Sequence, residues 1–187
     1  RDSADSPRYP VTAGTKELQD AIRNWAITHL GATGGFDVLP VIGSKELVAW
    51  LPTLLQSKNV IYPEVAYPTY AVGALVAGAE VIPVSLDPDT WPDWPELNSN
   101  DLVWINSPSN PTGQVSSPEL LTKIISWSRS RGVTLASDEC YLDFGWDGSY
   151  GLEGTDALSR GSSGNAQYQR FHHALGAVKN GFVYFCF

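Results

Sequence analysis

The sequence predicts an α/β fold, a three-layer αβα sandwich built on a mostly parallel sheet. Short apolar runs alternate with segments of helical period, and this order is typical of a parallel sheet with helices on both faces. A length of 187 residues is enough for a domain with its own core, and 43% hydrophobic with 17% charged residues is a globular composition. Ligands of such sheets bind beyond the carboxyl ends of the strands, so the residues that follow each expected strand are the first candidates for function.

The N-terminal part of the chain predicts two helices with one strand between them. Residues 16–30 place apolar side chains near one face at helical spacing, with Thr15 as the expected N-cap. The nearly all-apolar run over 38–42 predicts a buried strand. A second helical pattern covers 47–55, where Pro52 should kink the helix or displace a neighbouring hydrogen bond.

The alternation continues through the middle of the chain. Strands are expected over 60–62, 80–84, 102–106 and 133–137, and a helix over 70–77. Another helix is expected where Ser116 and Glu119 match a capping box, and Gly132 should end it. Glycine, serine and asparagine dominate from about residue 149 and no period follows, so the segment 149–187 predicts little regular structure.

Composition and charge exclude several classes of partner. The formal net charge of −8 argues against a nucleic-acid surface, and no apolar run reaches the length that spans a membrane. Two cysteines, Cys140 and Cys186, are too few for a disulfide framework, so the reducing cytoplasm is the expected location. We expect no metal site.

The turn Gly43-Ser44-Lys45 joins the expected strand over 38–42 to the helix that follows. Such a turn leaves backbone N–H groups at the helix N-terminus, where the helix dipole favours an anion, and Ser44 can add a hydroxyl donor. The segment equally fits an ordinary strand-to-helix connection with Ser44 as N-cap. Its glycine and lysine spacing is not that of a P-loop.

Two more polar segments follow buried strands. Pro108 and Pro111 restrict the backbone on both sides of Asn110, which we expect to be held at the sheet edge, although turn residues alone could explain the segment. Asp138 ends the strand over 133–137, where an unpaired carboxylate would be costly and a cationic partner would remove that cost. Tyr141, three residues on, could reach the same ligand. The open alternative for Asp138 is an N-cap or a structural ion pair.

These segments together resemble a known family. Ser107-Pro-Ser-Asn-Pro-Thr-Gly113 followed by Asp138-Glu-Cys-Tyr141 resembles the paired signature of the class I/II, fold type I, aminotransferases, which depend on pyridoxal 5′-phosphate (PLP). Three longer strings are similar to actinobacterial succinyldiaminopimelate aminotransferases: Gly43-Ser-Lys-Glu-Leu-Val-Ala-Trp-Leu-Pro52, Ala66-Tyr-Pro-Thr-Tyr70 and Ser137-Asp-Glu-Cys-Tyr-Leu-Asp-Phe-Gly-Trp146. The resemblance runs from about residue 7 to 148 and implies that residues 1–148 form an incomplete PLP-binding large domain. Residues 149–187 show no family match, and we interpret them as a frameshifted or disordered tail.

The resemblance implies cofactor contacts for Gly43, Ser44, Lys45, Tyr67, Asn110, Asp138, Tyr141 and Tyr9. Asp138 would pair with the protonated pyridine nitrogen, while Asn110 and Tyr141 would bind the ring's phenolic oxygen. Tyr67 would stack on the ring face, and the turn that begins at residue 43 would hold the phosphate. Tyr9 would reach the phosphate of the neighbouring subunit in a homodimer. For Tyr67, Tyr70 and Tyr9 the alternative is packing in the core or at an interface.

The family also needs a lysine that binds the cofactor covalently and moves the proton. After residue 148 only Lys179 is available, and its neighbours differ from the family's pattern. Lys179 is therefore a weak candidate, and the catalytic residue stays unassigned.

Three functions remain open on the sequence. The resemblance implies a PLP-dependent aminotransferase that acts on small amino acids and keto acids. The favoured one is a succinyldiaminopimelate transaminase of diaminopimelate and lysine biosynthesis, with glutamate as amino donor. The alternatives are an inactive remnant without the covalent lysine and another fold type I enzyme, such as a lyase.

Overall fold

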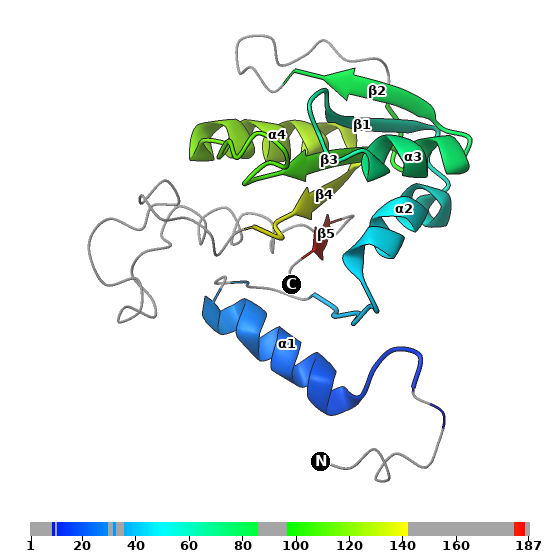
Figure 1. Cartoon of the computed structure of the whole chain (residues 1–187). Coiled ribbons are helices and arrows are strands. Elements are labelled where there is room, and N and C mark those ends of the chain that lie inside the picture. The colour runs from blue at the N-terminus through cyan, green and yellow to red at the C-terminus, as the bar shows by residue number, and fades with distance from the viewer. Residues whose placement is uncertain are drawn as a thin grey trace.

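The computed structural model of the chain describes residues 9, 11–29, 32, 36–85, 97–141 and 182–185 (Figure 1). Its elements, in chain order, are α1 (Lys16–His29), α2 (Ser44–Leu55), β1 (Asn59–Pro63), α3 (Thr69–Val76), β2 (Glu80–Val84), β3 (Leu102–Asn106), α4 (Pro118–Arg131), β4 (Thr134–Asp138) and β5 (Phe182–Phe185). The strands form one parallel sheet in the order β2-β1-β3-β4-β5. The predicted α/β class is confirmed.

Hydrophobic cores lie on both faces of this sheet. Successive side chains of a strand point to opposite faces, and β3 shows the consequence. Val103 and Ile105 pack in one buried cluster with residues of α4, whereas Leu102 and Trp104 pack in another with residues of α2 and α3. The sheet is therefore covered by α4 on one side and by α2 and α3 on the other, which is the expected three-layer arrangement.

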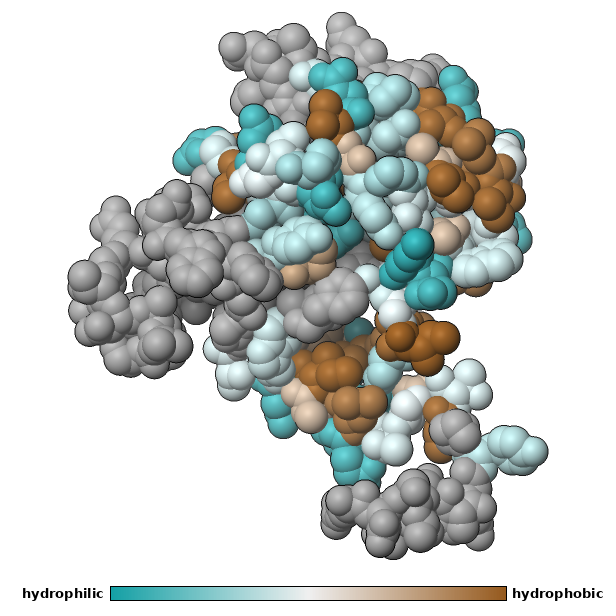
Figure 2. Space-filling view, in the orientation of Figure 1, coloured by the Kyte–Doolittle hydropathy of each residue, from teal (hydrophilic) through white to brown (hydrophobic). Residues whose placement is uncertain are grey.

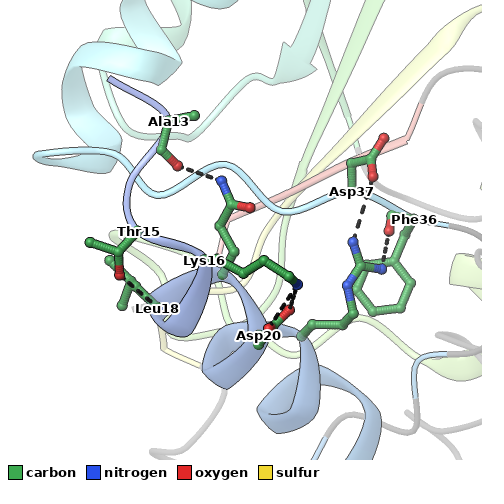
Figure 3. Close-up of polar contacts among 9 residues, drawn as sticks. Ala13, Thr15, Lys16, Leu18, Asp20, Phe36 and Asp37 are labelled. Atoms are coloured by element: carbon green, nitrogen blue, oxygen red, sulfur yellow. Dashed lines mark hydrogen bonds and ion pairs between the residues drawn. The ribbon is translucent and has the colours of Figure 1, made fainter. Parts of the chain in front are cut away.

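Helix α1 begins where the sequence predicts. The Oγ1 atom of Thr15 accepts from the backbone N–H of Leu18 at 3.3 Å, so Thr15 is the N-cap (Figure 3). The Lys16 ammonium pairs with Asp20 one turn on, at 2.8 Å. Further along, the guanidinium of Arg23 donates to the backbone carbonyl of Phe36 and stacks over its ring, which ties the helix to the segment leading into α2.

The expected strand over 38–42 is absent. The structure has extended coil there, and the side chains of Leu39 and Ile42 are exposed, the latter completely. Pro40 lacks the N–H that a ladder needs and packs instead against Gly14, whose φ of +77° forms a left-handed turn. An apolar run forms a buried strand only when a neighbouring strand is available, and none pairs with this segment in the described part of the chain.

Two details of the helices also differ from expectation. The N-cap of α4 is Ser117, whose hydroxyl accepts from the N–H of Leu120 at 3.2 Å. The predicted box with Ser116 is wrong, because the N–H of Ser116 is bound to the hydroxyl of Ser107. Pro52 lies inside α2, and the helix continues past it to Leu55 before Gln56 ends it in a left-handed conformation.

The C-terminal segment contributes one strand where the sequence predicted little regular structure. Residues 182–185 form β5 and pair in parallel with β4, from Leu135 against Phe182 to Asp138 against Phe185. The rest of the segment 149–187, including Lys179, lies outside the described residues. The expectation of a tail without a family match therefore stays a prediction.

The contact between α2 and α3 makes Gly73 sensitive to substitution. A Cβ atom at Gly73 would lie 2.8 Å from the backbone oxygen of Ala49 and 3.1 Å from that of Val48. Backbone atoms cannot move aside cheaply, so we expect Gly73→Ala to lower the free energy of unfolding by about 1–3 kcal/mol in urea denaturation. Val72→Ala, at an exposed position of the same helix, should change it by less than about 0.5 kcal/mol. Equal effects of the two changes would contradict this account of the packing.

Candidate functional site

A cleft of about 260 Å³ opens where the carboxyl ends of β3 and β4 meet the N-terminus of α2. Its lining consists of Ser44, Lys45, Val48, Tyr67, Asn106, Asn110, Asp138, Cys140 and Tyr141. Most of the residues predicted to contact a cofactor are therefore brought together, although they come from four separate segments. Gly43 adjoins this set as the N-cap residue of α2. Tyr9 is not among the lining residues, and its side chain is 99% exposed.

Asp138 supplies a buried acid to the cleft. It is the last residue of β4 and is only 7% exposed. Its Oδ2 atom accepts from the hydroxyl of Tyr70 at 2.6 Å, and its Oδ1 atom accepts from the backbone N–H of Cys140 at 3.4 Å. Both donors are neutral, and no cationic side chain in the described ranges pairs with this carboxylate. A carboxylate can accept about four hydrogen bonds, so Asp138 retains acceptor capacity for a cationic N–H group in the cleft.

The loop after β3 is held against this acid by Asn106. The side chain of Asn106 is 2% exposed and bridges two segments. Its amide NH₂ donates to the backbone oxygen of Asp138 at 2.9 Å, while its carbonyl accepts from the backbone N–H of Asn110 at 2.7 Å. A further bond from the N–H of Gly113 to the carbonyl of Ser109 closes the loop. Asn110 is thus presented to the cleft by a fixed backbone, as the sequence predicted.

Sequence reasoning gave Asn106 no role of its own. The sequence did contain a signal for such a role, because a buried amide that ends an otherwise apolar strand must find hydrogen-bond partners.

Two tyrosines from the segment around the start of α3 lie beside the acid. Tyr67 lines the cleft, and its ring meets that of Tyr70 edge-on at 6.0 Å. Tyr70 is fully buried and stacks on Trp104 of β3 at 4.8 Å. Burial and the neighbouring Asp138 charge raise the pKa of Tyr70 far above its ordinary value, so its phenol stays protonated and remains a donor.

Tyr141 closes the cleft near Cys140 and is 39% exposed. The pKa of its phenol is raised, first by the negative charge that Cys140 carries at high pH, then by partial burial and by Asp138. Tyr141 is therefore also a protonated hydrogen-bond donor at neutral pH. Cys140 itself also lines the cleft.

The N-terminus of α2 also borders the cleft. Ser44 and Lys45 are the first two residues of the helix, and Gly43 caps it without a side-chain hydrogen bond. The φ of Gly43 is 175°, an extended value open to any residue, so its backbone angles do not require glycine. The carboxylate of Glu46 lies close to Gly43, 2.7 Å from where a Cβ atom on that residue would stand. An anion that bound the first-turn N–H groups here would require this carboxylate to turn away.

Other kinds of site are not found in the described part of the chain. No group of three or more His, Cys, Asp or Glu side chains there could hold a metal ion. No helix among the described residues is long and apolar enough to cross a membrane.

Comparison with known proteins gives a consistent set of relatives. The sequence model of the family described as aminotransferase class I and II matches residues 1–164. A probable aminotransferase of Mycobacterium tuberculosis is 47% identical over 150 residues, which are 76% of this chain and 34% of that protein. The 4-dedimethylamino-4-oxo-anhydrotetracycline transaminase of Streptomyces rimosus is 44% identical over 78% of this chain and 40% of its own length.

More distant relatives have similar coverage. An LL-diaminopimelate aminotransferase of Gloeobacter violaceus is 31% identical over 79% of this chain and 41% of its own length. The crystal structure of an aminotransferase from Neisseria meningitidis superposes with a TM-score of 0.69 at 25% identity, over 98% of this chain and 47% of that one. The chain thus spans between a third and a half of the length of each of these proteins.

Proposed function

Because this chain belongs to the class I and II aminotransferases, a family of PLP-dependent transferases, we propose that its cleft is the cofactor-binding part of an aminotransferase active site. The observation that carries this proposal is that Asp138 and Ser44 line the same cleft. The cofactor has a cationic ring nitrogen and an anionic phosphate, so it needs both a carboxylate and an anion-binding helix N-terminus. The donor set fits this cofactor, because a buried carboxylate with neutral donors would meet the ring nitrogen and first-turn N–H groups would meet the phosphate.

Each side chain of the cleft would make a different contact with the cofactor. When bound, PLP supplies an electron sink for the α-carbon of the substrate. Asp138 would keep a proton on the ring nitrogen, and Asn110 and Tyr141 would bind the ring's phenolic oxygen. Tyr67 would pack on the ring face and limit the access of water. Gly43, Ser44 and Lys45 would bind the phosphate.

The proposed substrate is a keto acid of diaminopimelate biosynthesis, N-succinyl-2-amino-6-ketopimelate, with glutamate as amino donor in the cytoplasm. Support comes from the resemblance of the longer sequence strings and from a relative named for LL-diaminopimelate. Another relative, a transaminase named for a tetracycline intermediate, has a higher sequence identity to this chain than the LL-diaminopimelate aminotransferase has. Its substrate class should therefore be included in the same assay. The test is amino transfer from glutamate to a panel of keto acids by the purified protein. Turnover restricted to other keto acids would reject the proposed substrate.

The proposed aminotransferase is a homodimer, in which Tyr9 would reach the partner's phosphate site. Tyr9 is almost fully exposed in the single chain. Helix α3 carries the exposed apolar residues Val72, Leu75 and Val76, and an apolar surface lies over this part of the molecule at the right of Figure 2. Exposed apolar patches are typical of interfaces. Light scattering of the purified protein measures the oligomeric state, and a monomer at all concentrations would contradict this proposal.

Covalent trapping separates catalysis from simple binding. The chain is mixed with PLP, reduced with borohydride and digested for peptide mapping. A label on Lys179 would identify the covalent lysine and support an active enzyme. Retention of PLP without any label would support the alternative of an inactive remnant that keeps the cofactor cleft. Failure to retain PLP at all would reject the site.

The proposed phosphate contact of Ser44 allows a separate prediction. We expect Ser44→Ala to weaken PLP binding about tenfold, because a hydroxyl that donates to a charged group contributes about 1.5 kcal/mol. Binding of pyridoxal, which has no phosphate, should change less than about twofold. Fluorescence titration measures both affinities, and Ser126→Ala on the exposed side of α4 is the matched control. Equal losses for the two ligands would show that Ser44 does not contact the phosphate.

A further inference from the structure

We propose that Tyr70 is a positioning residue for the cofactor: its hydroxyl orients the Asp138 carboxylate for pairing with the protonated ring nitrogen. This inference rests on the proposed function, since it concerns the same cleft. It assigns a role to a side chain that lies outside the cleft lining.

The contact itself is short and buried. The hydroxyl of Tyr70 lies 2.6 Å from Oδ2 of Asp138, the usual distance for an O–H donor to a charged oxygen. The bond joins residues 68 positions apart, and both side chains are at least nine-tenths buried. Water is thus largely excluded from replacing the Tyr70 hydroxyl as a donor to Asp138. The Tyr70 bond therefore sets the rotation of the carboxylate, together with the weaker 3.4 Å contact from the Cys140 N–H.

Three packing contacts fix the position of the Tyr70 ring. Its ring stacks on Trp104 of β3, the strand next to β4 in the sheet. Its other neighbour is Tyr67, which lines the cleft. Helix α3, which carries Tyr70, packs closely against α2 at Gly73, next to the backbone of Ala49. A phenol fixed in this way has little freedom to follow the carboxylate, so the carboxylate must adapt to the phenol.

The chemistry of the donor suits this role. Burial and the charge of Asp138 raise the pKa of Tyr70, so it is a neutral donor at neutral pH. A neutral donor fixes the direction of the carboxylate without cancelling its charge. A lysine or arginine at the same place would neutralise Asp138 and compete with the ring nitrogen for it.

The test compares two ligands that differ at one atom. PLP and its 1-deaza analogue, in which a C–H group replaces the ring nitrogen, are titrated into the full chain. Tyr70→Phe keeps the aromatic stack and removes only the hydroxyl. We expect it to weaken PLP binding by about tenfold to a hundredfold, the range for a hydrogen bond to a charged group, and to weaken binding of the analogue by less than about twofold. Tyr62→Phe, the same chemical change at a half-buried position in β1, should alter neither affinity.

The outcomes are distinct. Equal losses for the two ligands in Tyr70→Phe would overturn the inference and leave the proposed site intact. Failure of the unmutated chain to bind either ligand would overturn the proposed function and the inference with it. If Tyr70→Phe does not fold, the hydroxyl proton of ¹³C-labelled Tyr70 is followed by NMR in the unmutated chain. It should shift on addition of PLP and not with the analogue, and an identical response to both would contradict the inference.

Discussion

Replacing Asp138 by asparagine should weaken PLP binding by about thirtyfold to several thousandfold and leave the free chain about as stable as before. Removing one partner of a buried, hydrogen-bonded charge pair costs about 2–5 kcal/mol of binding free energy. Without a ligand, Asp138 is a buried carboxylate that only neutral groups contact. An asparagine oxygen can still accept from Tyr70, and the cost of burying a charge disappears.

Two measurements on the same variant test this. Fluorescence titration gives the affinity for PLP, and urea denaturation without PLP gives the free energy of unfolding, which we expect to stay within about 1 kcal/mol of the unmutated value. A large loss of stability with unchanged affinity would show that Asp138 is a structural residue. That result would remove the main support for the cofactor site.

The largest effect on stability is expected from Asp101→Ala. Asp101 is completely buried just before β3, and its two oxygens accept from the backbone N–H groups of Lys58, Asn59 and Asn98 and from the amide of Asn59, at 2.9–3.2 Å. Alanine would leave these buried donors without an acceptor, at about 1–3 kcal/mol for each donor that water cannot reach. We expect the free energy of unfolding to fall by about 3–5 kcal/mol, a large part of the 5–15 kcal/mol typical of a domain.

Two further variants serve as controls for this result. Asp101→Asn keeps the shape and one accepting oxygen, so about half of the loss is expected. Asp20→Ala removes an exposed pair with Lys16 and should change stability by less than about 0.5 kcal/mol. If Asp101→Ala cost no more than Asp20→Ala, water would have to reach the donors at the start of β1, which contradicts the structure.

Strands β3 and β4 could be predicted from sequence because every residue in them is buried. The run over 102–105 is apolar throughout, and the helix before β4 has a clear period. The run over 38–42 looks similar, yet it forms no strand, because pairing depends on a neighbour that a local pattern cannot specify. The same reason explains why residues 182–185 were missed, since their partner β4 lies more than forty positions earlier.

The site was predictable to the extent that its residues lie at the ends of strands. Ser44, Asn110 and Asp138 each follow an expected strand in sequence, although the first strand does not form. Asn106 also ends an expected strand, but its hydrogen-bond partners and those of Tyr70 could not be assigned from sequence. Their roles depend on contacts across 32 and 68 positions, and only the fold brings those segments together.

The most direct test of the cofactor site is a crystal structure of this chain with PLP. We expect the ring nitrogen at hydrogen-bond distance from the Asp138 carboxylate, about 3 Å, with the phosphate of the same molecule on the N–H groups at Ser44. A ring nitrogen that faces away from Asp138, or a phosphate bound anywhere other than the start of α2, would contradict it.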